Sequence, residues 1–312
     1  MSSLQSPPAP DEPSPAPAAS FEQALAAERR SREDRTPDWP AWMAPAALFG
    51  GLVLSAVGSL IVDLPAAAFG VSITSAHVPA GLEIADTIVQ DIGFVLVAIF
   101  FARMGGRAVR SWQFGLRPPR LRRLWTILLP IALLLLFVIF SVIWAAVLHE
   151  STKEKLLEQL GANESATLLL LSAALTCVVA PICEEFLFRG FIFTALRNWK
   201  GTWPAAIITG LLFGGVHIGS APVVDLVPLA FLGFGLCLLY RITGSLYPCI
   251  AAHSLNNSIA YGSLESWSFG QVILLLGASL AVIGALVLVA KRVGVIAAPP
   301  LSSPAAAVIA GA

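Results

Sequence analysis

One stretch of the chain constrains its fold more than any other, because two glutamates follow directly on a long uncharged run. The eighteen residues from Ala166 to Cys183 carry no charge, and Glu184 and Glu185 come next. A run of this length and apolar character can cross the hydrocarbon core of a bilayer. Ionisable groups at its end are costly to bury and usually face the protein interior or a cavity. The run therefore predicts a transmembrane helix that carries a functional site.

The composition extends this prediction to the whole protein. Hydrophobic residues make up 57% of the 312 residues and charged residues only 12%, whereas soluble domains contain about 25% charged residues. These values exclude a soluble globular protein and indicate an all-α, polytopic transmembrane bundle in contact with the lipid bilayer. The formal net charge is zero, so nucleic acid is not expected as a partner.

Apolar segments and basic connections together predict a topology. About eight candidate spans lie at 44–62, 84–102, 125–148, 166–188, 204–218, 226–240, 245–262 and 269–290. Arginine and lysine gather in alternate connections, and seven arginines fall between the second and third spans. Because basic loops remain in the cytoplasm, both termini are predicted to be cytoplasmic.

The ends of the chain differ in composition from its centre. Residues 1–40 are rich in proline and alanine, and we expect a disordered cytoplasmic tail there. Residues 293–312 are expected to form a second disordered tail. Between the tails, residues 41–165 are predicted to hold N-terminal transmembrane helices with their loops, and residues 166–292 a transmembrane core, which the family resemblance described below implies to be catalytic.

Three polar clusters lie in or beside the C-terminal spans. In each cluster two residues stand four apart, on one face of a helix: Glu185 with Arg189, Phe213 with His217, and His253 with Asn257. Three helices are therefore predicted to present polar groups to a shared cavity.

The two glutamates differ in their expected neighbours. Arg189 lies one helical turn from Glu185 and is expected to pair with it, which would fix the orientation of the segment. Glu184 points about 100° away and has no basic residue at helical spacing, which suits a general base. Pro181 is expected to weaken the helix just before the glutamates and to open space for water.

Histidine and asparagine complete the predicted apparatus. His217 and His253 can donate hydrogen bonds or transfer protons, and the amide of Asn257 can stabilise a developing oxyanion. A carboxylate base, a water molecule and several hydrogen-bond donors are suited to amide hydrolysis.

The ordered set of motifs resembles the CPBP family of intramembrane endopeptidases, which includes the CAAX prenyl endopeptidases and bacterial relatives linked to bacteriocin processing or self-immunity. Ala-Pro-Ile-Cys-Glu-Glu-Phe-Leu-Phe-Arg-Gly at 180–190 is similar to the family's first motif almost throughout. The resemblance covers about residues 166–262. It implies an endopeptidase that cleaves a membrane-associated protein or peptide, in the cell (inner) membrane of a prokaryote.

The resemblance also implies roles for six residues. They are Glu184 and His217 for activation of the hydrolytic water, His253 and Asn257 for the oxyanion, and Glu185 and Arg189 for support of the site. No cofactor is expected. Two glutamates and two histidines are ligand types for zinc, but the chain has no His-Glu-x-x-His signature and a carboxylate paired with arginine is a poorer ligand.

Two other functions fit the same residues. Membrane-embedded Glu, His and Arg also serve as proton relays, so an ion- or proton-coupled transporter is the main alternative. All the intramembrane chemistry is expected in the C-terminal half, which disfavours a carrier built from two related halves. A catalytically inactive membrane scaffold of the same architecture is the second alternative.

Overall fold

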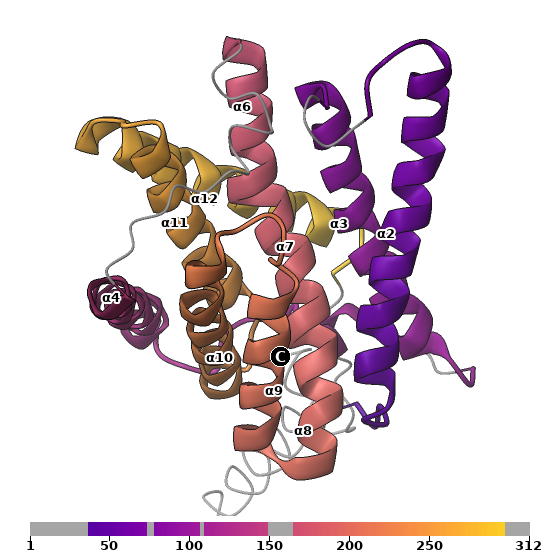
Figure 1. Cartoon of the computed structure of the whole chain (residues 1–312). Coiled ribbons are helices and arrows are strands. Elements are labelled where there is room, and N and C mark those ends of the chain that lie inside the picture. Colours follow the sequence, from indigo (N-terminus) through magenta and orange to yellow (C-terminus); the bar gives the residue numbers. More distant parts are fainter. Residues whose placement is uncertain (1–36, 74–77, 107–108, 149–164, 297–312) are drawn as a thin grey trace, which may run out of the picture. The chain divides into compact units, whose positions relative to one another are not determined.

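The described part of the chain is helical and contains no β-sheet (Figure 1). The computed structural model describes residues 37–73, 78–106, 109–148 and 165–296. Its α-helices are α2 (Met43–Ala68), α3 (Ala80–Arg103), α4 (Arg123–Leu148), α6 (Ala166–Ala174), α7 (Ala180–Glu185), α8 (Thr194–Lys200), α9 (Thr202–Gly215), α10 (Leu226–Thr243), α11 (Tyr247–Leu264) and α12 (Phe269–Arg292). The predicted all-α fold class is confirmed.

Among the described residues, six helical segments are long and apolar enough to cross a membrane. They are α2, α3, α4, the long helix Ala166–Lys200, the segment Val223–Thr243 that contains α10, and α12. The chain is thus a multi-pass membrane protein. The other two predicted spans are present as helices, but α9 has only 14 residues and rises about 21 Å, less than the thickness of a hydrocarbon core.

The sidedness of the termini stays a prediction, because no membrane is present in the structure. Most of the two predicted tails lies outside the described residues, which begin at residue 37 and end at residue 296.

The long helix Ala166–Lys200 is continuous but changes its register twice. Two π-helical segments, Leu175–Val179 and Phe186–Phe193, flank the short α7 that carries both glutamates. Pro181 lies in the first turn of α7. The proline therefore interrupts the α-helical register, as expected, but the helix continues through it. Such π segments are frequent at functional sites.

Close helix contact explains the glycines of α9. A β-carbon at Gly210 would lie 2.7 Å from the carbonyl oxygen of Ala230, and one at Gly214 would lie 2.5 Å from that of Leu226. Only glycine therefore allows α9 to pack this closely on α10, as small residues do at contacts between membrane helices. Gly215, in contrast, faces open space, so it does not contribute to this contact.

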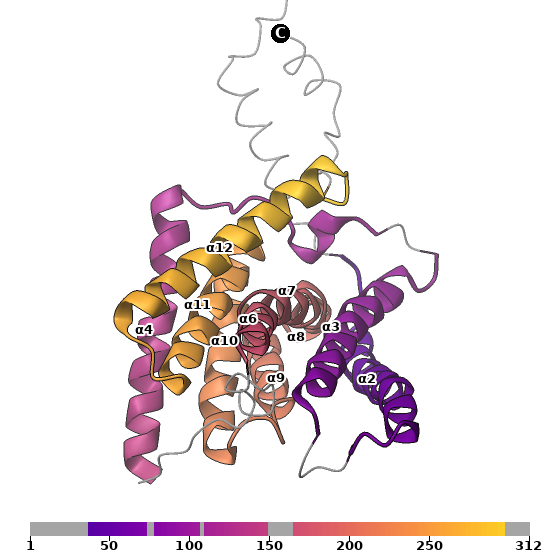
Figure 2. The same ribbon diagram turned by 90° about the horizontal axis from the view of Figure 1, so that it is seen from above.

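The other helices surround the long helix. α2 and α3 form an antiparallel pair on one side of it (Figures 1 and 2). α4 is seen end-on in Figure 1 and lengthwise in Figure 2, so it runs crosswise to the long helix. The buried aromatic core lies just beyond the glutamates, where Phe188 makes edge-to-face contacts with Phe94 of α3 and Phe213 of α9.

Candidate active site

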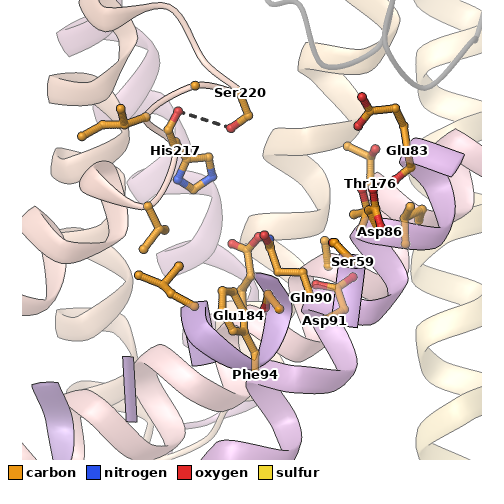
Figure 3. A pocket seen from close by; sticks show the side chains of 18 of the residues that line it. Ser59, Glu83, Asp86, Gln90, Asp91, Phe94, Thr176, Glu184, His217 and Ser220 are labelled. Atoms are coloured by element: carbon orange, nitrogen blue, oxygen red, sulfur yellow. Dashed lines mark hydrogen bonds between the residues drawn. The ribbon is translucent and has the colours of Figure 1, made fainter. Parts of the chain in front are cut away.

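Four of the six predicted site residues line one cavity of about 520 Å³. Glu184 comes from α7, His217 from the turn after α9, and His253 and Asn257 from α11. In Figure 3 the side chains of Glu184 and His217 point toward each other across this cavity. The fold thus brings together the three polar clusters that are far apart in the sequence, which are called the first, second and third motifs in chain order.

Glu185 and Arg189 form a buried ion pair behind the cavity wall. Nη1 of Arg189 lies 2.6 Å from Oε1 of Glu185, and both side chains are fully buried. Nη2 of Arg189 donates a hydrogen bond to the carbonyl oxygen of Gly233 at 3.0 Å, and the guanidinium lies 4.4 Å from the centre of the Phe213 ring. The predicted pairing is therefore present, and it fixes the long helix against both α9 and α10.

Glu185 also holds the histidine of the third motif. Nδ1 of His253 lies 3.0 Å from Oε1 of Glu185. A carboxylate oxygen accepts this hydrogen bond, so Nδ1 carries the proton. Nε2 of the same ring lies 3.9 Å from Oε2 of Glu184, which is beyond hydrogen-bond distance. Of the two glutamates, His253 is thus hydrogen-bonded to Glu185 alone, and its Nε2 lies on the side of Glu184.

His217 lies outside the helix on which it was predicted. α9 ends at Gly215, and the backbone N–H of His217 donates to the carbonyl of Gly214 rather than to that of Phe213. The carbonyl of Phe213 is left without a helical donor, as is usual for the last turn of a helix. Nδ1 of His217 takes this place at 2.7 Å. Because a carbonyl only accepts, the proton is on Nδ1, and Nε2 of the neutral ring carries a lone pair.

Pro181 explains how α11 attaches to the long helix. Proline has no N–H, so it cannot donate to the carbonyl of Cys177 in an α-helix or to that of Thr176 in a π-helix. Oγ of Ser254 donates to the carbonyl of Cys177 at 2.6 Å, and Nδ2 of Asn257 donates to that of Thr176 at 2.9 Å. The carbonyls that proline leaves free thereby position the asparagine of the third motif.

The asparagine keeps one donor for the cavity. Its oxygen accepts a hydrogen bond from Nδ2 of Asn256 at 3.3 Å. Since an amide nitrogen carries two hydrogens and Thr176 uses one, the second N–H of Asn257 remains.

The opposite wall of the cavity is an acidic face of α3. Five polar residues of α3 line it: Glu83, Asp86, Thr87, Gln90 and Asp91. Figure 3 labels four of them, Glu83, Asp86, Gln90 and Asp91. Residues 83, 87 and 91 stand four apart and share one helix face. Sequence reasoning missed this face, although three carboxylates in an apolar span are a readable signal. The expectation that all the intramembrane chemistry lies in the C-terminal half is therefore wrong.

Asp91 stands out on this face because it is buried without a partner. Its exposed fraction is 1%, and among the described residues neither carboxylate oxygen has a hydrogen-bond partner. Oε2 of Glu184 is likewise buried and unpartnered. The carboxyl groups of Asp91 and Glu184 lie close enough to interact electrostatically.

The site does not fit a zinc ion in this geometry. In the described part of the chain, no three His, Cys, Asp or Glu side chains are grouped as metal ligands. Oε1 of Glu185 already accepts from Arg189 and His253, so its capacity as a ligand is reduced. Metal independence nevertheless stays a prediction.

Comparisons with known proteins point to one family. Residues 166–259 match the family model described as type II CAAX prenyl endopeptidase Rce1-like, so the resemblance predicted from the motifs is confirmed over this segment. A Mycoplasma capricolum protein described as "Uncharacterized protein" is 33% identical over 93 residues, which are 30% of this chain and 27% of that protein. The Bacillus subtilis protein described as "Putative membrane peptidase YdiL" is 35% identical over 81 residues, 26% of this chain and 32% of that protein.

These similarities are local. The matched residues span about a third or less of the length of either relative. No solved structure matches the chain significantly. All of the matched segment lies in the C-terminal half, so the acidic face of α3 has no counterpart in the family match.

Proposed function

We propose that the Rce1-like segment makes this protein an intramembrane endopeptidase, which hydrolyses a peptide bond of a membrane-associated protein or peptide. The observation that carries the proposal is the convergence of Glu184, His217, His253 and Asn257 on one cavity. The name of the Bacillus relative, "Putative membrane peptidase YdiL", is consistent with it. Because both relatives are bacterial, we assign the protein to the cell membrane of a prokaryote.

Glu184 is the general base of the proposed reaction. Its side chain lines the cavity, and no described residue donates a hydrogen bond to its Oε2, so the carboxylate is available to take a proton from water in the cavity. Nε2 of His217 accepts the other hydrogen of the same water. The oxygen of the water is thereby directed at the substrate carbonyl, and a low-dielectric cavity strengthens each of these interactions.

The tetrahedral oxyanion forms on the α11 side of the cavity. The second N–H of Asn257 donates to it, and Nε2 of His253 is the other candidate donor. His253 already donates from Nδ1 to Glu185, so a second donation requires the doubly protonated ring. Glu184 then returns its proton to the leaving amine, and the peptide bond breaks.

Glu185 and Arg189 position this apparatus without touching the substrate. Neither lines the cavity, yet Glu185 orients the ring of His253. Arg189 in turn holds Glu185 and lies over the ring of Phe213, whose carbonyl orients His217.

A second candidate function is cation or proton transport. The acidic face of α3 lies opposite Glu184 and His217 in the same cavity, an arrangement that also suits a proton relay. An assay of proton flux distinguishes a transporter from an endopeptidase. The flux into liposomes that contain the purified protein is monitored with a pH-sensitive dye. Flux that Glu184→Gln abolishes, without any peptide cleavage, would identify a transporter.

The test of the proposed function is cleavage of a quenched fluorogenic peptide library by the purified protein in detergent micelles. We expect Glu184→Gln and His217→Asn each to lower turnover at least about a hundredfold, a usual scale for the loss of a general base or of an oriented donor. His217→Asn places an amide nitrogen near the position of Nδ1 and so keeps a donor for Phe213. Glu265→Gln, which removes a carboxylate outside the cavity, is the matched control.

Equal turnover in wild type and Glu184→Gln would reject the assignment. Chelator treatment of the same sample tests the predicted absence of a metal requirement, which full activity after chelation would support.

A further inference from the structure

The cavity carries a strongly one-sided charge. Four carboxyl groups line it, from Glu83, Asp86, Asp91 and Glu184, and none of the described lining residues is lysine or arginine. A cleft lined by one sign of charge between low-dielectric walls concentrates the electric field and attracts the opposite charge. The charge of the cavity thus favours a cationic occupant.

Asp91 shows that the described part of the protein supplies no partner for one of these carboxyl groups. It is 1% exposed, lines the cavity, and has no hydrogen-bond partner on either oxygen among the described residues. Burial of a carboxylate without a partner is strongly unfavourable. A cation that enters the cavity would supply the missing partner.

The other two carboxylates of α3 extend the acidic wall away from Glu184. Glu83 and Asp86 repel each other and also Asp63, and Oδ1 of Asp86 has no hydrogen-bond partner among the described residues. Eight residues of helix separate Glu83 from Asp91, a rise of about 12 Å. An extended peptide covers this distance with about four residues.

We propose that the acidic face of α3 is a specificity subsite, which selects substrate segments with a lysine or arginine within about four residues of the bond that is cleaved. The cation lies against Asp91 when the basic residue is next to that bond, and against Asp86 and Glu83 when it is farther away. This inference rests on the proposed function, because it assigns the substrate class of the same cavity.

Binding tests the subsite independently of catalysis. The probe is a fluorescent twelve-residue peptide of leucine and alanine with one central lysine and blocked ends, and its partner has norleucine in place of the lysine. Both are titrated by fluorescence anisotropy, in nonionic micelles at 0.15 M NaCl, against protein that carries Glu184→Gln to prevent cleavage. Micelles without protein give the background.

We expect the lysine peptide to bind at least about tenfold more tightly than the norleucine peptide, a ratio within reach of one partly desolvated charge pair. Adding Asp86→Asn and Asp91→Asn should reduce this ratio to below about threefold, mainly by weakening the lysine peptide. Adding Glu265→Gln, which removes one carboxylate elsewhere, should leave the ratio unchanged. Equal affinities for the two peptides, or a preference that survives Asp86→Asn with Asp91→Asn, would overturn the subsite.

Cleavage kinetics distinguish failure of the subsite from failure of the proposed function. With Glu184 intact, Asp86→Asn should raise KM for a lysine-containing substrate about tenfold more than KM for the norleucine substrate, with the larger effect on KM than on kcat. Cleavage without any preference for lysine would keep the endopeptidase and reject the subsite. Tight lysine-dependent binding without cleavage would keep the subsite and reject the endopeptidase.

Discussion

Glu184 and Glu185 are adjacent in sequence but have opposite surroundings. Oε1 of Glu185 accepts from Arg189 and from His253 inside the protein, whereas Oε2 of Glu184 is buried beside the cavity without a partner. A charge that is neutralised by its neighbours supports the fold. A charge that is left unsatisfied lowers stability and is retained for its chemistry.

This contrast predicts opposite effects of the same substitution on stability. Glu185→Gln should lower the free energy of unfolding by about 3–5 kcal/mol, because it leaves the buried Arg189 without its counter-charge. Glu184→Gln should leave stability unchanged or raise it slightly, because it removes an unpaired buried charge. Thermal unfolding in micelles, monitored by tryptophan fluorescence, measures both. Equal losses in the two variants would contradict this assignment.

The long helix and α11 are joined by hydrogen bonds that a single proline makes available. The long apolar runs in the sequence predicted both helices, and polar residues four positions apart predicted which side chains share one helix face. These patterns did not predict the π-helical register, the contacts of Ser254 and Asn257 with the long helix, or the exit of His217 from α9. These features depend on which backbone carbonyls lack a helical donor, and that is decided by contacts between segments far apart in the chain.

The joint between these helices predicts a coupling between Ser254 and Pro181. Ser254→Ala should cost about 1–3 kcal/mol, because it leaves the buried carbonyl of Cys177 unpaired. In a Pro181→Ala background, the loss of unfolding free energy caused by Ser254→Ala should be smaller by at least about 0.5 kcal/mol. The reason is that residue 181 then has an N–H that can donate to the carbonyl of Cys177. Unfolding of the four proteins of this cycle gives the coupling energy.

Ser258→Ala is the matched control for the cycle. Oγ of Ser258 donates to the carbonyl of Ser254 within its own helix, so its loss should leave no carbonyl unpaired. A cost equal to that of Ser254→Ala, or no coupling to Pro181, would count against this role of the proline.

The protein as a whole divides into an outer apolar surface and an inner polar site. Only 6% of the apolar stretch of α4 is buried inside the protein, against 44% for the segment that contains α10. The apolar composition predicted this membrane surface correctly. It concealed the acidic face of α3, because the most apolar stretch of this helix still has a mean hydropathy of 1.9.

The division predicts which helices lipid can reach. A lipid-soluble diazirine photolabel should modify α4 and α12 several times more than α10, because a larger part of their apolar surface faces outward. Digestion followed by mass spectrometry locates the label. Uniform labelling of the three helices would contradict the arrangement.

Because Glu185 accepts hydrogen bonds from both Arg189 and His253, the activity of Glu185 variants needs careful interpretation. One oxygen atom anchors the arginine of the first motif and the imidazole of the third. Loss of that oxygen disorients two motifs at once, so an inactive Glu185 variant does not identify Glu185 as a reacting group. Inactivity carries mechanistic meaning only at positions such as Glu184, where the rest of the apparatus stays assembled after the side chain is changed.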